Sequence, residues 1–365
     1  MNKIQRNFGF GCMRLPMKDG AVDYAEFSRM IDIFLDAGYN YFDTAHGYLD
    51  GKSEGAIRDC LVARYDRERY VLTNKLSIWY VKDASEVRPY FENQLVACGV
   101  DYFDFYLCHA LDRESYEDYK RCRAFETVSE LKAEGKVRHV GISFHDTADV
   151  LDRILTEQPS IEVVQLQINY LDADDPAVQS VACYETAVRH GKRVIVMEPV
   201  KGGALVGLPD GAKAIFDATG GGSYASYALR YAASFPAVFM VLSGMGSVAM
   251  VEDNVKSMYP FRPLDERERD ACDRARAVIR EAKQIPCTAC NYCAELCPKG
   301  ITISAHFRAA NEVSMAHLTR SEARATLPVG GGPADCIGCG ACESVCPQHI
   351  HIREQLANVK KALRL

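Results

Sequence analysis

The chain has 365 residues, of which 48% are hydrophobic, and its formal net charge is −6 at pH 7. This length suits one large domain, or a large domain followed by a small one. The acidic balance excludes the basic surface of nucleic-acid-binding proteins, so we expect no nucleic-acid partner. The N-terminal stretch lacks the apolar run of a signal peptide. The uncharged stretch 231–251 contains Pro236, Gly244 and Gly246, so we also expect no membrane span.

A strand pattern recurs about every 30 residues from the N-terminus to residue 260. The candidate strands are 8–13, 39–45, 69–75, 104–110, 138–144, 163–169, 193–199 and 238–244. Segments with helical periodicity separate them, and several of these end in a glycine. Eight alternating strand–helix units predict a parallel sheet closed into a (β/α)8 TIM barrel over residues 1–262. An open doubly wound sheet is the alternative, but no G-x-G-x-x-G follows the first strand.

The composition changes after Pro263. Residues 263–285 are rich in charge and predict a helix that connects the barrel to the rest of the chain. Residues 286–365 contain two dense cysteine motifs, a helical insert between them and a terminal amphipathic helix. We therefore expect a second, small domain over 286–365.

The two motifs share one spacing. Residues 287–298 read CTACNYCAELCP and residues 336–347 read CIGCGACESVCP. Each is C-x2-C-x2-C-x3-C followed by proline, which is the spacing with which thiolates hold iron–sulfur clusters. Structural zinc sites are the alternative, but they use two cysteine pairs with a longer gap between them. The repeated motif predicts two [4Fe–4S] clusters in a ferredoxin-like domain.

In two-cluster ferredoxins, the cysteine that precedes proline ligates the cluster of the other motif. Carried over to this chain, that rule gives one cluster the ligands Cys287, Cys290, Cys293 and Cys346. It gives the second cluster the ligands Cys336, Cys339, Cys342 and Cys297. The other seven cysteines are scattered singly, as small buried residues usually are, so we expect a reducing, cytoplasmic setting.

Four polar residues follow three consecutive candidate strands. Asp43 lies near the end of the second strand and Tyr48 follows it, whereas Lys75 and His109 lie at the ends of the third and fourth. The chemistry of a barrel lies on the loops that leave these strand ends. A neighbouring ammonium lowers the pKa of a phenol, which is ordinarily about 10, and a carboxylate holds the ammonium in place. With an imidazole to orient a carbonyl oxygen, the four residues predict a proton donor for a carbonyl that receives hydride.

Each of these residues taken singly also has a structural interpretation. Tyr48 is then a packing residue and Lys75 an ordinary lysine at the barrel rim. Asp43 is then a turn or helix-capping residue, and His109 a hydrogen-bonded core histidine. The functional interpretation depends on four suitable residue types at three consecutive strand ends.

The motifs FGFGCMRLP, FDTAHGY, LTNK, LCHALD, GISFHD, VVQLQINY, VMEPVKGG and LSGMGS occur in this order over residues 8–258. In this the chain resembles the aldo/keto reductases, and its tail is similar to the branch with a C-terminal ferredoxin-type domain. The resemblance implies reduction of a small-molecule carbonyl, with C=O reduced rather than C=C. It makes Tyr48 the general acid, Lys75 and Asp43 the partners that lower its pKa, and His109 the residue that orients the carbonyl.

The resemblance also implies a nicotinamide cofactor, NADH or NADPH. Ser143 and Gln165 match positions that bind the nicotinamide carboxamide in the family, and Asn254 matches the position that contacts adenine. Two positions depart from the family pattern. Phe144 stands where the family has asparagine, and Met197 stands where an aromatic residue stacks on the nicotinamide ring.

The 2′-phosphate of NADPH is usually held by basic residues after the eighth strand. In this chain those positions are Gly244 and Met250. A phosphate without a cation forfeits a charge-assisted hydrogen bond worth roughly 1.5–3 kcal/mol. We therefore expect NADH to bind at least as well as NADPH.

A nicotinamide passes two electrons as hydride, whereas a cluster passes one, so direct exchange needs a converter such as flavin. Three interpretations stay open. The clusters exchange electrons with the barrel site through a flavin, a radical substrate or a partner such as ferredoxin. Alternatively, the chain is an ordinary NAD(P)H-dependent reductase with structural clusters. In the third, it is a redox-sensing binding protein on a reused barrel, which the four polar residues disfavour.

Overall fold

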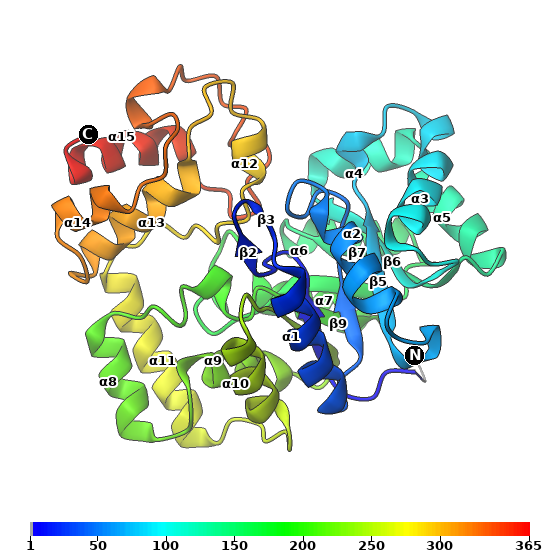
Figure 1. Ribbon diagram of the computed structural model, residues 1–365, viewed down its shortest axis with the longest axis horizontal. Helices are drawn as coiled ribbons and strands as arrows, with labels where there is room; N and C mark the ends of the chain where they lie inside the picture. The colour runs from blue at the N-terminus through cyan, green and yellow to red at the C-terminus, as the bar shows by residue number, and fades with distance from the viewer. Residues whose placement is uncertain (1–2) are drawn as a thin grey trace. The chain divides into compact units, whose positions relative to one another are not determined.

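The computed structural model describes residues 3–365 and divides into two compact units (Figure 1). The first unit extends to Pro199 and resumes over Ala225–Leu264, and the second contains Val200–Tyr224 and Asp265–Leu365. Among residues 3–365, no helix is both long and apolar enough to cross a bilayer. The domain boundaries expected after residues 262 and 285 stay a prediction.

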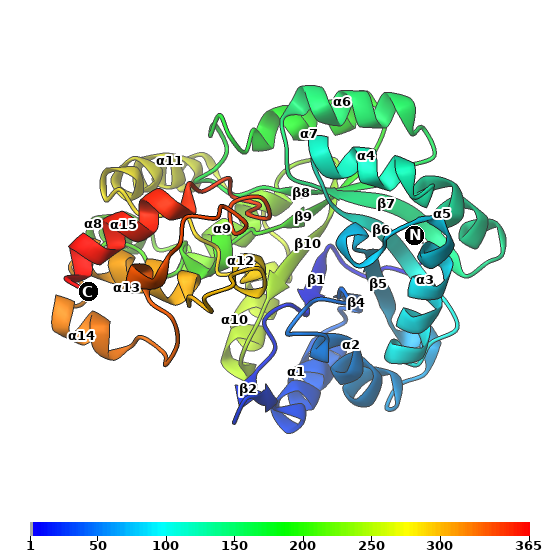
Figure 2. The same cartoon turned by 90° about the horizontal axis from the view of Figure 1, so that it is seen from above.

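The first unit is a closed barrel of eight strands, all parallel, in which β1 pairs with both β10 and β4. Figure 2 shows these strands with helices ranged around the outside. The predicted (β/α)8 barrel is therefore confirmed. A small antiparallel hairpin, β2 (Met17–Lys18) and β3 (Ala21–Val22), follows the first barrel strand. The barrel strands are β1 (Phe8–Gly11), β4 (Tyr41–Asp43), β5 (Val71–Leu76), β6 (Phe103–Leu111), β7 (Val137–Phe144), β8 (Val163–Gln167), β9 (Arg193–Met197) and β10 (Val238–Gly244).

Large apolar side chains from these strands form one buried cluster, including Tyr41, Phe105 and Met240. Gly141 makes room for them on β7, because a Cβ there would lie 2.5 Å from Val163 Cγ2. The barrel interior is therefore a packed core, and polar chemistry is left to the strand ends.

The first barrel helix shows why the outer layer forms. Helix α1 (Tyr24–Asp36) begins after Asp23, whose carboxylate accepts a hydrogen bond from the Glu26 backbone N–H. Its apolar residues recur at helical spacing, and the face they form is buried. The other helices of this unit are α2 (Lys52–Ile57), α3 (Ala84–Cys98), α4 (Arg113–Arg121), α5 (Ala124–Ala133), α6 (Ala148–Glu157), α7 (Ser180–Arg189), α9 (Tyr224–Ala233) and α10 (Val248–Met258).

The second unit is helical and contains both cysteine motifs. Helix α8 (Asp210–Thr219), from the segment after β9, packs on α11 (Glu266–Glu281), with the Cβ position of Gly211 3.2 Å from Val278 Cγ1. The remaining helices are α12 (Tyr292–Glu295), α13 (Ile303–Ser314), α14 (Arg320–Ala325) and α15 (Ile352–Leu363). Their apolar side chains form one core with Cys293 and Cys342, so the cysteines and the core are built together.

Candidate active site and cysteine-lined cavities

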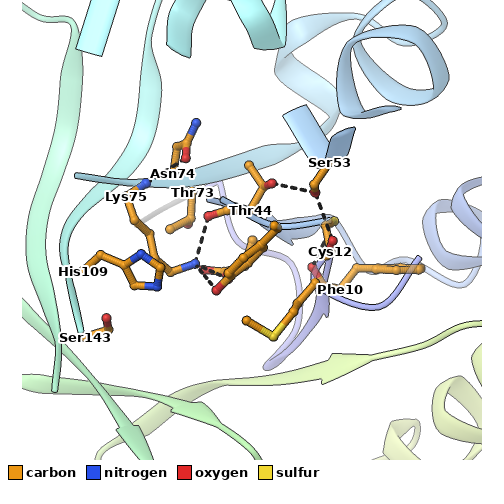
Figure 3. Close-up of polar contacts among 12 residues, drawn as sticks. Phe10, Cys12, Thr44, Ser53, Thr73, Asn74, Lys75, His109 and Ser143 are labelled. Carbon is orange, nitrogen blue, oxygen red and sulfur yellow. Dashed lines mark hydrogen bonds and ion pairs between the residues drawn. The ribbon is translucent and has the colours of Figure 1, made fainter. Parts of the chain in front are cut away.

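Lys75 is the centre of the polar group at the barrel mouth. Its Nζ donates hydrogen bonds to Asp43 Oδ1 at 2.6 Å, to the Thr44 carbonyl at 2.8 Å and to Tyr48 Oη at 3.1 Å. Figure 3 shows the hydrogen bond between the Lys75 amino group and the Thr44 carbonyl. The side chain is 1% exposed. The parallel register of β4 and β5 brings the ends of these strands side by side, so the carboxylate, ammonium and phenol meet.

Burial and charge act in opposite directions on the ion pair. Burial lowers the pKa of Lys75, and the Asp43 carboxylate opposes that effect. Burial likewise raises the pKa of Asp43 against the effect of Lys75. Asp43 and Lys75 therefore each stabilise the charged form of the other in a site that excludes water.

His109, at the end of β6, lies beside this group. Its Nδ1 is 2.7 Å from Ser77 Oγ, and its ring centroid lies 5.9 Å from that of Tyr48. Burial holds the pKa of His109 well below its ordinary value, and the positive charge of Lys75 lowers it further. The imidazole is therefore neutral near pH 7. When Nδ1 accepts from the Ser77 hydroxyl, Nε2 carries the proton and can donate it in a hydrogen bond.

A second buried network supports Lys75 from behind. Asn74 Oδ1 accepts from the Lys75 backbone N–H at 2.8 Å, and Asn74 Nδ2 donates to Glu54 Oε1 at 2.8 Å. Glu54 Oε2 lies 2.8 Å from His46 Nδ1, and Gln94 Nε2 donates to Asn74 Oδ1. The sequence pattern did not predict roles for Asn74 and Gln94, because Asn74 precedes the last residue of its candidate strand and Gln94 lies within α3.

The predicted nicotinamide residues lie on neighbouring strands. Ser143 on β7 pairs in register with Gln165 on β8, and both side chains are buried. Ser143 Oγ accepts from the Ala110 backbone N–H at 2.7 Å. Within residues 3–365, two buried oxygens of this site have no hydrogen-bond partner, namely Gln165 Oε1 and Asp43 Oδ2. A carboxamide N–H and a ribose hydroxyl are donors that fit these two acceptors.

The other residues predicted to bind the nucleotide lie at two strand ends and in one helix. Met197 and Gly244 end β9 and β10, where the chain leaves the barrel mouth. Asn254 lies in α10 and is buried, and its Nδ2 donates to Ser243 Oγ at 3.0 Å. Its predicted contact with adenine stays a prediction.

Sequence reasoning missed one cation near Gly244. A Cβ on Gly244 would lie 3.5 Å from both Cβ and Cδ of Arg14, which follows β1. The Arg14 guanidinium lies 3.5 Å from Glu198 Oε1. Arg14 follows β1, and closure of the barrel pairs β1 with β10. The approach of Arg14 to Gly244 could therefore be inferred only from the predicted barrel topology, and not from the residues after the eighth strand.

The eight motif cysteines divide into two sets of four. Cys287, Cys290, Cys293 and Cys346 line one cavity. Cys297, Cys336, Cys339 and Cys342 line another. These are the two crossed sets expected from the sequence. Within residues 3–365, no three or more His, Cys, Asp or Glu side chains are grouped as ligands of a metal ion.

Burial affects the thiols of the first set. Burial raises the pKa of Cys293, and the neighbouring cysteines raise it further. Burial also raises the pKa of Cys346, against hydrogen bonds from the backbone N–H groups of Ile350, Gln348 and His349. Thiolates are the form that binds iron, so a cation bound in this cavity would favour that form.

Comparison with protein families decides the identity of the first unit. Residues 7–277 match the aldo/keto reductase family, which covers well over half of the chain. The chain belongs to the aldo/keto reductase family. Residues 286–350 of this aldo/keto reductase match a 4Fe-4S dicluster domain, which supports iron–sulfur clusters in the second unit.

Individual relatives of this aldo/keto reductase are distant. An aryl-alcohol dehydrogenase [NADP(+)] of Phanerodontia chrysosporium is 29% identical over 147 residues, covering 35% of this chain and 36% of that protein. L-galactose dehydrogenase of Arabidopsis thaliana is 24% identical over 297 residues, covering 76% and 91%. The solved structure of aldo-keto reductase AKR11C1 from Bacillus halodurans is 24% identical and covers 74% and 91%, with a TM-score of 0.60. That likeness supports the fold.

Proposed function

We propose that this aldo/keto reductase reduces an aldehyde or ketone of a small molecule at the site formed by Asp43, Tyr48, Lys75 and His109. The observation that carries the proposal is the buried Lys75 ammonium, shared between Asp43 Oδ1 and Tyr48 Oη. A phenol beside a fixed cation is a proton donor whose negative charge, once the proton has left, is stabilised in place.

In this proposal Tyr48 donates its hydroxyl proton to the carbonyl oxygen. Lys75 stabilises the phenolate that remains, and Asp43 holds Lys75 so that the ammonium need not reorganise. His109, neutral and held by Ser77, donates a hydrogen bond that fixes the direction of the carbonyl oxygen. The substrate oxygen therefore meets two donors from one buried group.

A nicotinamide nucleotide supplies hydride when it is bound. Gln165 and Ser143 would hold its carboxamide, and Asp43 Oδ2 would accept from its ribose. The orphaned oxygens of Gln165 and Asp43 support this assignment. Met197 would lie against the ring, Gly244 would leave space for the phosphates, and Asn254 would lie at the adenine.

We also propose that the two sets of four cysteines hold [4Fe–4S] clusters that pass electrons to or from the barrel site or a partner such as ferredoxin. A bound flavin is one converter between hydride and single electrons. The cytoplasm is the proposed setting, supported by seven further cysteines that are all buried.

A plain reductase with structural clusters is the second candidate. Its support is the C-terminal core, in which the cysteines pack among the apolar residues of the helices. Either candidate uses the same barrel site.

Anaerobic titration of the purified protein separates the two. NADH, NADPH and reduced ferredoxin are added in turn while cluster absorbance and carbonyl consumption are followed. Bleaching of the clusters by ferredoxin, followed by recovery when a carbonyl is added, is the expected result. Carbonyl reduction by nucleotide with no change of the clusters supports the plain reductase. A failure to reduce any aldehyde or ketone contradicts both.

A further inference from the structure

A buried lysine of the second unit has no place in the chemistry described so far. Lys201 belongs to the short turn Lys201–Gly203 that follows β9, and it is 3% exposed. Its Nζ donates a hydrogen bond to Gln348 Oε1 at 3.2 Å. A lysine is rarely buried to this degree without a role for its charge, because the charge must leave water.

Gln348 connects this lysine to one of the two cavities. It is 8% exposed and lines the cavity of Cys287, Cys290, Cys293 and Cys346. With its Oε1 engaged by Lys201, its amide N–H groups are the part that can donate toward sulfur. The Lys201 ammonium is therefore hydrogen-bonded directly to a residue that lines this cavity.

The turn is fixed against the same cavity by its backbone. Gly202 has φ +63°, and a Cβ there would lie 2.3 Å from the carbonyl oxygen of Thr288, another residue of the cavity wall. Only glycine permits this approach, so the contact sets where Lys201 sits. Lys201 is itself in the left-handed region, with φ +47°.

We propose that Lys201, acting through Gln348, raises the reduction potential of the cluster held by Cys287, Cys290, Cys293 and Cys346. This rests on the proposed function, since it requires that clusters occupy the cavities. A cluster gains negative charge when it accepts an electron, and a nearby cation in a poorly solvated site stabilises the reduced form. An amide N–H that donates to sulfur acts in the same direction.

The second cavity provides the contrast. The cations in its wall are Lys299 and Arg353, and both are exposed. Arg353 is also paired with Glu343 at 2.8 Å. Water and salt screen exposed charges, so these two side chains have little effect on their cluster. The two clusters should therefore differ in potential, with electrons resting on the one beside Lys201.

The test is a redox titration of the full chain, loaded anaerobically with both clusters and followed by EPR. Lys201→Gln should lower one midpoint potential so that the reduced-to-oxidised ratio at a fixed potential falls at least about tenfold, or 59 mV. The affected signal should be the one that Cys287→Ser removes. Lys201→Arg should keep the potential near that of the wild type, and Lys299→Gln, the matched exposed control, should leave both potentials unchanged.

Gln348→Glu is a second route to the same result, because a carboxylate there neutralises Lys201 without disturbing its turn. It should lower the same potential. If either Lys201→Gln or Gln348→Glu binds its full iron and shifts neither potential, or shifts both equally, the inference is wrong. If the wild type shows no cluster signal at all, the proposed clusters fail and this inference fails with them.

Discussion

The barrel site and the cysteine cavities differ in how buried ionisable groups are compensated. At the barrel mouth, the Lys75 ammonium is matched within 3.1 Å by a carboxylate, a carbonyl and a phenol of the same chain. In the second unit, four sulfurs surround each cavity, and burial raises the pKa of Cys293 and Cys346. The barrel site is thus organised by its own residues, whereas burial in the first cysteine set disfavours the thiolates that the proposed clusters need. Substitutions at the barrel site should therefore alter the rate of carbonyl turnover, whereas substitutions of the motif cysteines should alter the iron content of the protein.

The largest effect is expected from the two cysteines that precede proline. Cys297→Ser should remove the cluster of Cys336, Cys339 and Cys342, and Cys346→Ser the cluster of the first motif, because each lines the other motif's cavity. Iron counts and EPR of each variant measure the loss. Cys272→Ser, a buried cysteine of α11 outside both sets, should keep full iron. Loss confined to each cysteine's own motif would contradict the crossed assignment.

Within the barrel, Tyr48→Phe should lower carbonyl turnover by roughly 10²–10⁴, the usual cost of losing a general acid. Iron content and fold should be unchanged, since Tyr48 Oη accepts a hydrogen bond from Lys75 in the barrel site, and the substitution removes only the hydroxyl. Steady-state kinetics with one aldehyde measure the effect. Tyr24→Phe, on the exposed start of α1, is the matched control and should have normal turnover. Undiminished turnover of Tyr48→Phe would remove Tyr48 from the proposed mechanism.

The neutral state of His109 predicts how stability depends on pH. Burial lowers the pKa of His109, so below about pH 6.5 the unfolded chain binds a proton that the folded barrel does not. Stability from this group is therefore present at pH 7 and is lost as the pH falls. Between pH 7 and 5.5 the loss should be about 1 kcal/mol. Urea unfolding of the wild type and of His109→Asn measures it, and the variant should lose less stability by that amount. Equal losses would mean that His109 is protonated in the folded state.

The smallest effect is expected at Arg14. NADH should bind at least as well as NADPH, because the Arg14 charge beside Gly244 is balanced by Glu198. Glu198→Gln removes that carboxylate and should improve NADPH relative to NADH by about threefold, or some 0.6 kcal/mol. The single tryptophan, Trp79, lies 5.1 Å from the His109 ring, so its fluorescence can report nucleotide binding. Adding Arg14→Gln to the Glu198→Gln variant is the matched control, and it should abolish the gain in NADPH binding. NADPH binding more than tenfold tighter in the wild type would contradict the expectation.

The contrast also explains what the sequence could predict. Strand ends carry the four polar residues, and in a closed parallel barrel neighbouring ends must meet, so Asp43, Lys75 and His109 could be grouped before any coordinates. The cysteine spacing likewise restricts the ligand sets. Arg14 could not be assigned, because its approach to Gly244 depends on how the first and last strands close. Lys201 could not be assigned either, because the neighbouring sequence does not indicate that residues 200–224 belong to the same unit as residues 265–365.

The crossed ligand sets also constrain the order of events during synthesis. Cys346 lies 53 positions after Cys293, so the first motif has only three of its four proposed ligands while that stretch is translated. At 5–20 residues per second, this interval lasts roughly 3–10 seconds. During it, three thiols stand in a chain that cannot yet enclose a cluster and are open to oxidation. With the proposed crossed sets, iron–sulfur insertion is expected to follow translation of both motifs, because a chain that ends between them contains no complete set of four ligands.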